Sequence, residues 1–166
     1  MINIRTATLY DINTVSCVLA TSWKFAYQGI IHDEYLDLLS DSHWVDFLTT
    51  GIKNKTIFTM VLESEKNIIG VAILNEIKKE NTAHLISLYL LPEKMKQGFG
   101  HMLYTEIETK IKNMGFVKCT LDVLEHNQHA INFYKAHGFF DTNEKIQTKL
   151  GGHEYICKVY EKKLLN

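Results

Sequence analysis

LYLLPEKMKQGFGHML, residues 88–103, contains the transition that decides the fold. It ends an apolar, β-rich run (residues 82–91) at Pro92, which has no N–H group to donate to a neighbouring strand. A helix follows the two glycines, and the first turn of a helix offers unpaired N–H groups and the positive end of a dipole. Gly98 and Gly100 would let a phosphate approach that turn closely, because they carry no side chain. The stretch therefore predicts a strand, a phosphate-binding turn and a helix.

The residues around this turn favour an anionic ligand without identifying it. Lys94, Lys96 and His101 add side-chain donors. The usual nucleotide loops fit poorly, because the stretch has no Gly-Lys-Ser/Thr and no Gly-x-Gly-x-x-Gly. On these residues alone, an ordinary left-handed turn, a nucleotide-phosphate enzyme and a different phosphate ligand all stay open.

The pattern on either side switches between strand and helix periods. Before the turn we expect strands at residues 2–7, 56–63, 67–75 and 82–91, and helices at 11–28 (capped by Asp11), 33–39 and from Ser40 or Asp41 through Leu48. After it we expect helices at 99–114 and 127–137 and strands at 117–123, 139–149 and 153–163. The strand–helix–strand unit across 84–123 requires a right-handed parallel crossover. The predicted fold class is α/β: a mixed, mainly antiparallel central sheet with one parallel crossover and helices on both faces.

Length and composition exclude several classes of protein. The 166 residues favour one domain, 1–166. The 18 Lys and Arg against 19 Asp and Glu give a net charge of −1, which argues against a dedicated nucleic-acid binder. The longest apolar run, residues 68–74, is far shorter than the ~20 residues of a spanning helix, so we expect no membrane role. The start has no signal-peptide core and the three cysteines are scattered, so the expected location is cytoplasmic.

A second patch, NQHAINFYKAHGF at residues 127–139, follows the next expected strand. Together the two patches resemble the GNAT superfamily of N-acetyltransferases. In that family a Leu-Tyr-Val-like strand end, a proline and Gln/Arg-x-x-Gly-x-Gly/Ala bind acetyl-CoA, and a later helix reads Asn-x-x-Ala-x-x-Phe-Tyr-x-x-x-Gly-Phe. The matching positions here are Leu88, Tyr89, Leu90, Pro92, Gly98, Phe99, Gly100, Asn127, Ala130, Phe133, Tyr134, Gly138 and Phe139. Residues 21–39 also look like a bacterial branch of small members.

The resemblance implies acetyl-CoA as co-substrate and no metal. The residues expected to hold acetyl-CoA are Leu88, Tyr89, Leu90, Lys96, Gln97, Gly98, Phe99, Gly100, His101, Asn127 and Tyr134. One position departs from the family: Met95 stands where Gln or Arg is usual, and a thioether cannot donate a hydrogen bond to a phosphate. His126 and His129 lie three residues apart, but no third ligand follows at a suitable spacing, so we expect no zinc site.

The resemblance also implies direct attack of an amine on the thioester, with no enzyme nucleophile. The Leu90 N–H, freed by the family's bulge in this strand, is the expected donor to the developing oxyanion, and Tyr134 is the expected general acid. Two residues compete for the role of general base: His84, on the same strand as Leu90, and Asp122, near the end of the next strand. Each of the side chains also has a structural alternative, packing for Tyr134 and a sheet or surface position for the other two.

The resemblance implies that the acceptor is an amine of a small molecule or of a protein. In the family the first two helices and the late hairpin wall this site, which here contributes Trp23, Tyr27, Glu34, Tyr35, Asp37, Glu144, Glu154 and Tyr155. Aromatic and acidic side chains suit a cation, but polyamines, amino acids, antibiotics and protein N-termini all stay open. A CoA-binding regulator without turnover is the alternative function. The apolar residues on both faces of the last strand, such as Ile156 and Cys157, favour a homodimer.

Overall fold

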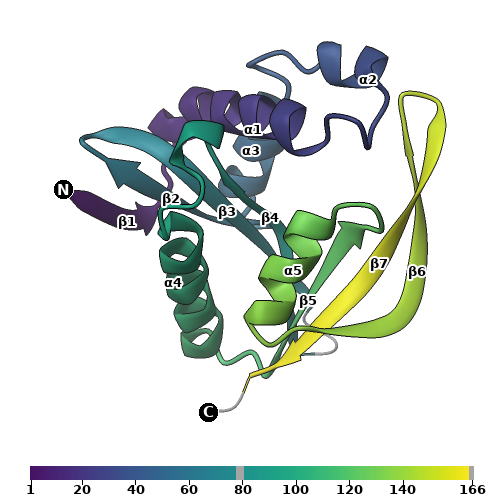
Figure 1. Ribbon diagram of the computed structural model, residues 1–166. Coiled ribbons are helices and arrows are strands. Elements are labelled where there is room, and N and C mark those ends of the chain that lie inside the picture. The colour runs from purple at the N-terminus through teal and green to yellow at the C-terminus, as the bar shows by residue number, and fades with distance from the viewer. Residues whose placement is uncertain (78–80, 165–166) are drawn as a thin grey trace.

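The computed structural model describes residues 1–77 and 81–164 of the chain (Figure 1). In those ranges the elements are β1 (Ile2–Thr6), α1 (Ile12–Ala26), α2 (Asp33–Asp37), α3 (Val45–Lys53), β2 (Phe58–Ser64), β3 (Asn67–Ile77), β4 (Thr82–Leu90), α4 (Phe99–Asn113), β5 (Lys118–Leu124), α5 (Gln128–Ala136), β6 (Phe140–Leu150) and β7 (His153–Lys163). Short 3-10 turns precede α1 (η1, Leu9–Asp11) and α4 (η3, Pro92–Lys94). The order of strands and helices expected from the sequence is confirmed.

The strands form one mixed sheet in the order β1-β2-β3-β4-β5-β7-β6. Of its neighbouring pairs only β4 and β5 run parallel, joined by the crossover through α4. Figure 1 shows α1 and α3 on one side of the sheet, and α4 and α5 on the other. The fold class predicted from the sequence is therefore confirmed.

Alternation along the strands explains the two layers of helices, because successive strand residues face opposite sides of a sheet. Val61 and Val71 are buried against α1 and α3, whereas their chain neighbours Leu62 and Ala72 are buried against α4. Ile107 is among the buried α4 residues that complete the second layer. The two apolar cores hold the sheet rigid from both sides, which positions the strand ends where the site lies.

The sheet opens in its middle, between β4 and β5. These strands pair only over Thr82–His84 and Lys118–Thr120, although both continue well beyond. Across β4, Leu85 lies opposite Leu74 and Ser87 opposite Ile73, so that Ile86 is an extra residue, a β-bulge. Bulges bend a strand and increase its twist. The bulge therefore helps to turn the second half of β4 away from β5.

Two local predictions were wrong. The third helix begins at Val45 rather than at Ser40 or Asp41, because the Trp44 N–H donates to Ser16 Oγ of α1 and the preceding residues form turns. Asp11 occupies the N-cap position of α1, but its carboxylate makes no cap hydrogen bond to that helix; it accepts instead from the Thr8 N–H at 2.7 Å, within the η1 turn. It also pairs with both guanidinium NH groups of Arg5 on β1, at 2.8 and 2.9 Å.

The last strand, β7, lies inside the sheet between β5 and β6, so β6 is the edge strand at this end of the sheet. Of the two residues named for β7, Ile156 and Cys157 are both half-buried. The larger exposed apolar side chains of this hairpin are on β6, at Phe140 and Ile146. A homodimer stays a prediction, which the mass of the protein in solution would check.

Candidate active site

The turn before α4 has the geometry expected of a phosphate site. Gly98 is the N-cap with φ +85°, a left-handed conformation that glycine adopts without strain. The first hydrogen bond of the helix runs from the Met102 N–H to the Gly98 carbonyl at 3.1 Å. The N–H groups of Phe99, Gly100 and His101 therefore precede any intrahelical acceptor and are directed outward from the start of the helix.

Side chains around this turn divide into free and engaged groups. Lys96 is exposed, and Met95 is half-buried after the η3 turn. The Gln97 amide is engaged, because its Nε2 donates to the Glu93 carbonyl at 2.9 Å. Gln97 thus stabilises the loop through its side chain and would meet a phosphate only through its backbone.

His101 is held by a second histidine at the end of α5. His137 Nδ1 lies 2.8 Å from the Phe133 carbonyl, which can only accept, so Nδ1 carries the proton. In the neutral ring the Nε2 of His137 is then an acceptor, and His101 Nδ1, 2.9 Å away, donates to it. With its Nδ1 proton given to this hydrogen bond, His101 can donate to an anion only if its Nε2 carries a proton as well. This pair links the phosphate turn to α5.

Asn127 is the N-cap of α5. It is buried, and its side-chain oxygen accepts a hydrogen bond from the Ala130 N–H at 3.2 Å. The capping role leaves its amide NH₂ group available. The structure therefore gives Asn127 a structural role at the end of β5, beside the opening in the sheet.

The second half of β4 presents free backbone groups toward this opening. The Leu91 N–H donates to the Ile69 carbonyl of β3 at 2.9 Å. Because backbone groups alternate between the two edges of a strand, the N–H groups of Leu88 and Leu90 point away from β3, where β5 has separated. The Leu90 carbonyl, on that same edge, accepts from Ser22 Oγ of α1 at 2.9 Å. The outward direction of the Leu90 N–H thus follows from the alternation of backbone groups along β4. The β-bulge at Ile86 lies four residues earlier.

Tyr134 lies on α5 with its ring packed edge-on against Phe133 and Phe139. Among the described residues its hydroxyl has no hydrogen-bond partner, although that oxygen is not sealed from solvent. Burial raises the pKa of Tyr134, and the proximity of Tyr27 adds to the rise. The phenol therefore stays protonated at neutral pH, with its proton uncommitted.

The two residues that competed for the base lie side by side. His84 Nδ1 is 2.9 Å from Thr120 Oγ1, and His84 Nε2 is 3.6 Å from Asp122 Oδ2. Burial lowers the pKa of His84, and the Asp122 carboxylate opposes that shift. His84 is the more buried partner, at 21% side-chain exposure against 37% for Asp122. A neutral imidazole therefore lies beneath an accessible carboxylate.

Aromatic residues from distant parts of the chain line the α1 side of this opening. The Tyr27 and Tyr89 hydroxyls are 2.6 Å apart, and Trp23 packs against both rings. Burial raises the pKa of both tyrosines. Tyr35 is half-buried in the same apolar cluster. Of the acidic residues expected on this wall, Glu34, Asp37, Glu144 and Glu154 are exposed.

The late hairpin reaches the α2 region, as Figure 1 shows. Tyr155 of β7 accepts from the His32 N–H at 3.0 Å, and its hydroxyl lies 2.6 Å from His32 Nδ1. His32 stacks on His153 at 3.5 Å between ring centroids. At the hairpin turn, a Cβ on Gly151 would come within 2.9 Å of Tyr35. The hairpin is therefore packed tightly against this wall.

Four residues at the opening were missed in the sequence: Ser22, His32, Thr120 and Cys157. Cys157 belongs to the aromatic cluster, and burial together with the charges of Asp122 and Glu125 raises its thiol pKa. Thr120 was detectable in principle, since it lies two residues before Asp122 on a strand and so shares its face. Ser22 and His32 lie in the stretch 21–39 that resembles the family, and Cys157 was named only for the dimer, so none of the three was assigned to the site.

Residues 19–139 match the profile of the Acetyltransferase (GNAT) family.

The chain belongs to the GNAT acetyltransferase family.

Two curated family members are similar over most of the chain. The spermidine N(1)-acetyltransferase of Thermoplasma acidophilum is 29% identical over 165 residues, 96% of this chain and 98% of the relative. An uncharacterized N-acetyltransferase of Bacillus subtilis, YuaI, is 30% identical over 142 residues, 82% of this chain and 79% of the relative. The crystal structure of the PaiA N-acetyltransferase from Thermoplasma acidophilum in complex with coenzyme A is 28% identical, with a TM-score of 0.79 and 99% of both chains covered.

The turn before α4 suits the pyrophosphate of coenzyme A. A Cβ on Gly100 would meet Phe133 at 3.4 Å and Leu90 at 3.6 Å, so the turn packs closely against α5 and the end of β4. The unpaired N–H groups of that turn suit a pyrophosphate. Within residues 1–77 and 81–164, no group of three or more His, Cys, Asp or Glu side chains could hold a metal ion. No described helix is long and apolar enough to cross a membrane.

Proposed function

We propose that this acetyltransferase moves the acetyl group of acetyl-CoA to a primary amine of a small cationic molecule, with polyamines as the preferred class. One observation carries the proposal. The opening between β4 and β5 combines unpaired strand N–H groups, the uncommitted hydroxyl of Tyr134 and the His84–Asp122 pair. These are the donor, acid and base that direct aminolysis of a thioester requires.

Acetyl-CoA supplies an activated acetyl thioester. The N–H groups of Phe99, Gly100 and His101 would bind its pyrophosphate, and Lys96 adds a cation beside them. Met95 contributes no hydrogen bond, which the backbone donors compensate. The outward edge of Leu88 and Leu90 would align the pantetheine arm along β4 as an added strand.

The outward N–H of Leu90 would donate to the thioester oxygen as the amine attacks the carbonyl carbon. Leu88 presents a second N–H on the same edge, two residues nearer His84. A fixed donor of this kind stabilises the charge that develops on oxygen, and loss of one such donor typically costs 10²–10³-fold in kcat. Leu90→Pro removes the Leu90 N–H without breaking a β3–β4 hydrogen bond, and kcat is expected to fall within that range.

The C–S bond breaks as the C–N bond forms, and Tyr134 would donate its proton to the departing sulfur. A phenol of raised pKa is a weak acid in water. In this cleft, however, burial also destabilises a thiolate, because desolvation disfavours the anionic form of both groups. Proton transfer from Tyr134 to the departing sulfur is therefore less unfavourable in free energy than the raised pKa of Tyr134 alone suggests. The protonated form of Tyr134 is available throughout the neutral pH range.

The amine must lose a proton, and His84 with Asp122 would remove it. Asp122 is the more accessible partner and attracts the ammonium group, whereas His84 is neutral and can accept the proton. The opposing effects of burial and of the carboxylate keep His84 able to change charge. We assign the base to this pair rather than to either residue alone.

The acceptor side favours a cation with an extended apolar chain. Trp23, Tyr27 and Tyr89 offer ring faces, and Asp122 and Glu125 supply negative charge at the end of β5. The name of the Thermoplasma relative, a spermidine acetyltransferase, supports the same class. Several amines on one flexible chain match a site that combines aromatic walls with few carboxylates.

A thiol-release assay tests the proposal. Acetyl-CoA is mixed with spermidine, spermine, apolar and basic amino acids, an aminoglycoside and a peptide with a free N-terminus, and CoA release is followed for each. We expect the polyamines to give the highest kcat/KM. CoA release with another class of amine would mean that this class replaces polyamines as the acceptor, while the acetyltransferase activity itself would stand. Binding of acetyl-CoA without release for any amine would favour the regulator without turnover.

A further inference from the structure

His101 and His137 form a pair of imidazoles beside the phosphate turn. His137 is half-buried at the end of α5, and its ring packs against those of Tyr104 and Phe133, at 4.4 and 4.3 Å between centroids. Phe133 is also the nearest neighbour of a Cβ on Gly100, at 3.4 Å. Packing therefore holds His137 in place, with its Nε2 against His101 in the first turn of α4.

The hydrogen bonds of the pair determine where its protons lie while it is neutral. The Phe133 carbonyl, 2.8 Å from His137 Nδ1, requires the proton of that ring on Nδ1. His137 Nε2 is then an acceptor, and His101 Nδ1, 2.9 Å away, must carry the one proton of its own ring. In this neutral state an anion at His101 Nε2 would meet a lone pair rather than a donor.

One added proton changes that property. If the proton enters His101, both ring nitrogens carry N–H groups, and Nδ1 still donates to His137. If it enters His137, that ring donates from Nε2, His101 Nδ1 becomes the acceptor, and the proton of His101 moves to Nε2. In either arrangement the exposed imidazole of His101 has an N–H group free for an anion. The pair can therefore donate to a phosphate only as a cation.

No carboxylate of the described residues lies within ion-pair distance of either ring. The acidic residue on the neighbouring face of α4, Glu108, is engaged by Lys162 of β7 at 2.6 Å and by Lys112 at 2.8 Å. Lys162 itself lies 5.3 Å from the centre of the Tyr104 ring that packs on His137. A phosphate of the coenzyme would therefore supply the negative charge that a protonated pair lacks.

The other titratable groups around the pair keep their charge through the neutral range. Burial raises the pKa of Tyr104, so this phenol stays neutral. Burial of Glu108 is outweighed by hydrogen bonds from Lys112 and Lys162, which lower its pKa to about 2. Further charged side chains on the adjoining segments are Glu93, Lys94 and Lys96 before α4, Glu106 and Lys110 on α4, and Lys135 on α5.

We propose that binding of acetyl-CoA takes up a proton at the His101–His137 pair, and that His137 is the positioning residue that makes this uptake necessary. The proton comes from solvent, and the protonated pair donates from His101 Nε2 to a phosphate of the coenzyme. Histidine ordinarily changes charge between about pH 5 and 8, so coenzyme affinity would depend on pH in that range. The inference rests on the proposed placement of the coenzyme at this turn.

The direction of the pH dependence follows from the proton count. The bound state holds more protons than the free state, so affinity falls as pH rises, by at most about tenfold per pH unit for one proton. At low pH the free pair already carries the proton, and the dependence disappears. Without the acceptor at residue 137, a neutral His101 can place its one proton on Nε2 and bind a phosphate with no uptake.

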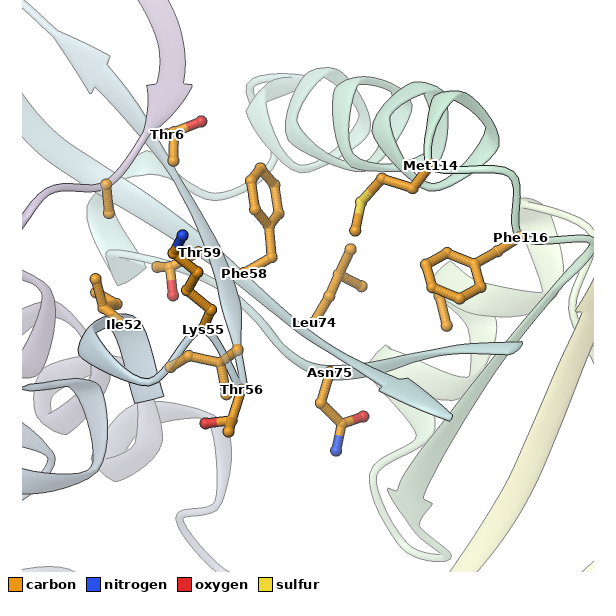
Figure 2. A pocket seen from close by; sticks show the side chains of 13 residues that line it. Thr6, Ile52, Lys55, Thr56, Phe58, Thr59, Leu74, Asn75, Met114 and Phe116 are labelled. Atoms are coloured by element: carbon orange, nitrogen blue, oxygen red, sulfur yellow. The ribbon is translucent and has the colours of Figure 1, made fainter. Parts of the chain in front are cut away.

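The opposite end of α4 offers an anion no such pair. Met114 and Phe116, just beyond that end, line a cavity of about 300 Å³ together with Phe58 and Leu74 (Figure 2). Among the described residues that line it, Lys55 is the one charged side chain and none is a histidine. An anion bound there would take up no proton in the neutral range. Proton uptake therefore distinguishes the first turn of α4 from this cavity.

Calorimetry on the full chain counts the protons. CoA and dephospho-CoA, which lacks the 3′-phosphate, are titrated in two buffers of different ionisation enthalpy, at slightly alkaline pH where free histidine is mostly neutral. We expect the parent to take up about one proton more per coenzyme than His137→Phe. Comparing the two proteins cancels the ionisation of the coenzyme's own phosphates. Equal uptake with dephospho-CoA would assign the contact to the pyrophosphate, and uptake with CoA alone would assign it to the 3′-phosphate.

His137→Phe keeps an aromatic ring against Tyr104 and Phe133. The Phe133 carbonyl still accepts from the backbone N–H of residue 137 at 3.2 Å, so the variant is expected to fold. In mildly acidic solution it should bind CoA about three- to tenfold more weakly than the parent, the difference between a charged and a neutral hydrogen bond, and the gap should narrow in alkaline solution. His43→Phe is the matched control, because His43 is exposed and packs on Trp44 in the other helix layer.

Nitrogen NMR of the histidine rings gives an independent readout. We expect His101 Nε2 to carry a proton only when CoA is bound, a change that a purely structural role of His137 would not produce. Saturable CoA binding in which the parent takes up no more protons than His137→Phe would overturn this inference and leave the coenzyme site standing. An absence of CoA binding to the parent would overturn the inference and the proposed coenzyme site together.

Discussion

The two halves of the opening between β4 and β5 are built in different ways. The half proposed for acetyl-CoA consists of backbone groups, the first turn of α4 and the outer edge of β4, supplied by one stretch of chain. The half proposed for the amine consists of side chains from α1, α2, β5 and β7. Backbone recognition depends on local conformation, whereas the amine half depends on how distant elements pack. Single substitutions in the first half should therefore abolish acetyl-CoA binding, whereas substitutions in the second half should change the kinetic constants for the amine by smaller factors.

Gly100→Glu should have the largest effect, the loss of measurable acetyl-CoA binding. The new carboxylate would stand at the N-terminal turn of α4 and repel a pyrophosphate. Gly100→Ala is the matched control, because a Cβ there meets its nearest neighbours at 3.4 and 3.6 Å, an ordinary contact. Isothermal titration with acetyl-CoA measures both. Wild-type affinity in a folded Gly100→Glu protein would contradict the placement of the phosphate.

Tyr134→Phe should lower kcat by roughly 10²-fold, the lower end of general-acid effects, with little change in acetyl-CoA affinity. The variant loses a hydroxyl that has no hydrogen-bond partner among the described residues, so folding should not suffer. Tyr10→Phe, at a fully exposed position, is the control. Steady-state kinetics that match the parent would show that Tyr134 only packs against Phe139.

His84→Ala and Asp122→Asn should each lower kcat/KM for the amine by about tenfold to 10²-fold, and the double variant should lose much less than the product of the two effects. Independent, fully multiplicative effects would contradict a shared role. Burial lowers the pKa of His84, so the acid limb of kcat/KM should lie below the ordinary histidine value of about 6.5. The Asp122 carboxylate raises that pKa, so Asp122→Asn should move the limb to still lower pH. An acid limb that moves to higher pH in Asp122→Asn would show that His84 is not part of the general base.

The same contrast explains how far the sequence could be read. The order of elements, the parallel crossover and the left-handed Gly98 follow from periodicity, glycine and proline, which act locally. The start of α3 was misplaced because a tertiary contact, Trp44 to Ser16, overrides the local cap signal. In the site, the sequence does not show that Thr120 lies beside His84, that His32 lies beside Tyr155, or that Cys157 joins the aromatic cluster. Their proximity depends on strand register and on the packing of the late hairpin, which a single sequence does not display.

Tyr155→Phe should have the smallest effect, a rise in the KM for the amine of about three- to tenfold with kcat and acetyl-CoA affinity unchanged. The variant removes hydrogen bonds of 3.0 and 2.6 Å to His32, each worth about 0.5–1.5 kcal/mol, while the ring stays in place. The hairpin would then hold the α2 wall less firmly, and the amine half would lose order that the backbone half keeps. Gly151→Ala should act in the same direction, because its Cβ would press on Tyr35 from a residue with φ +57°. A change confined to acetyl-CoA affinity in either variant would show that the hairpin serves the cofactor half, and the division between the two halves would fail.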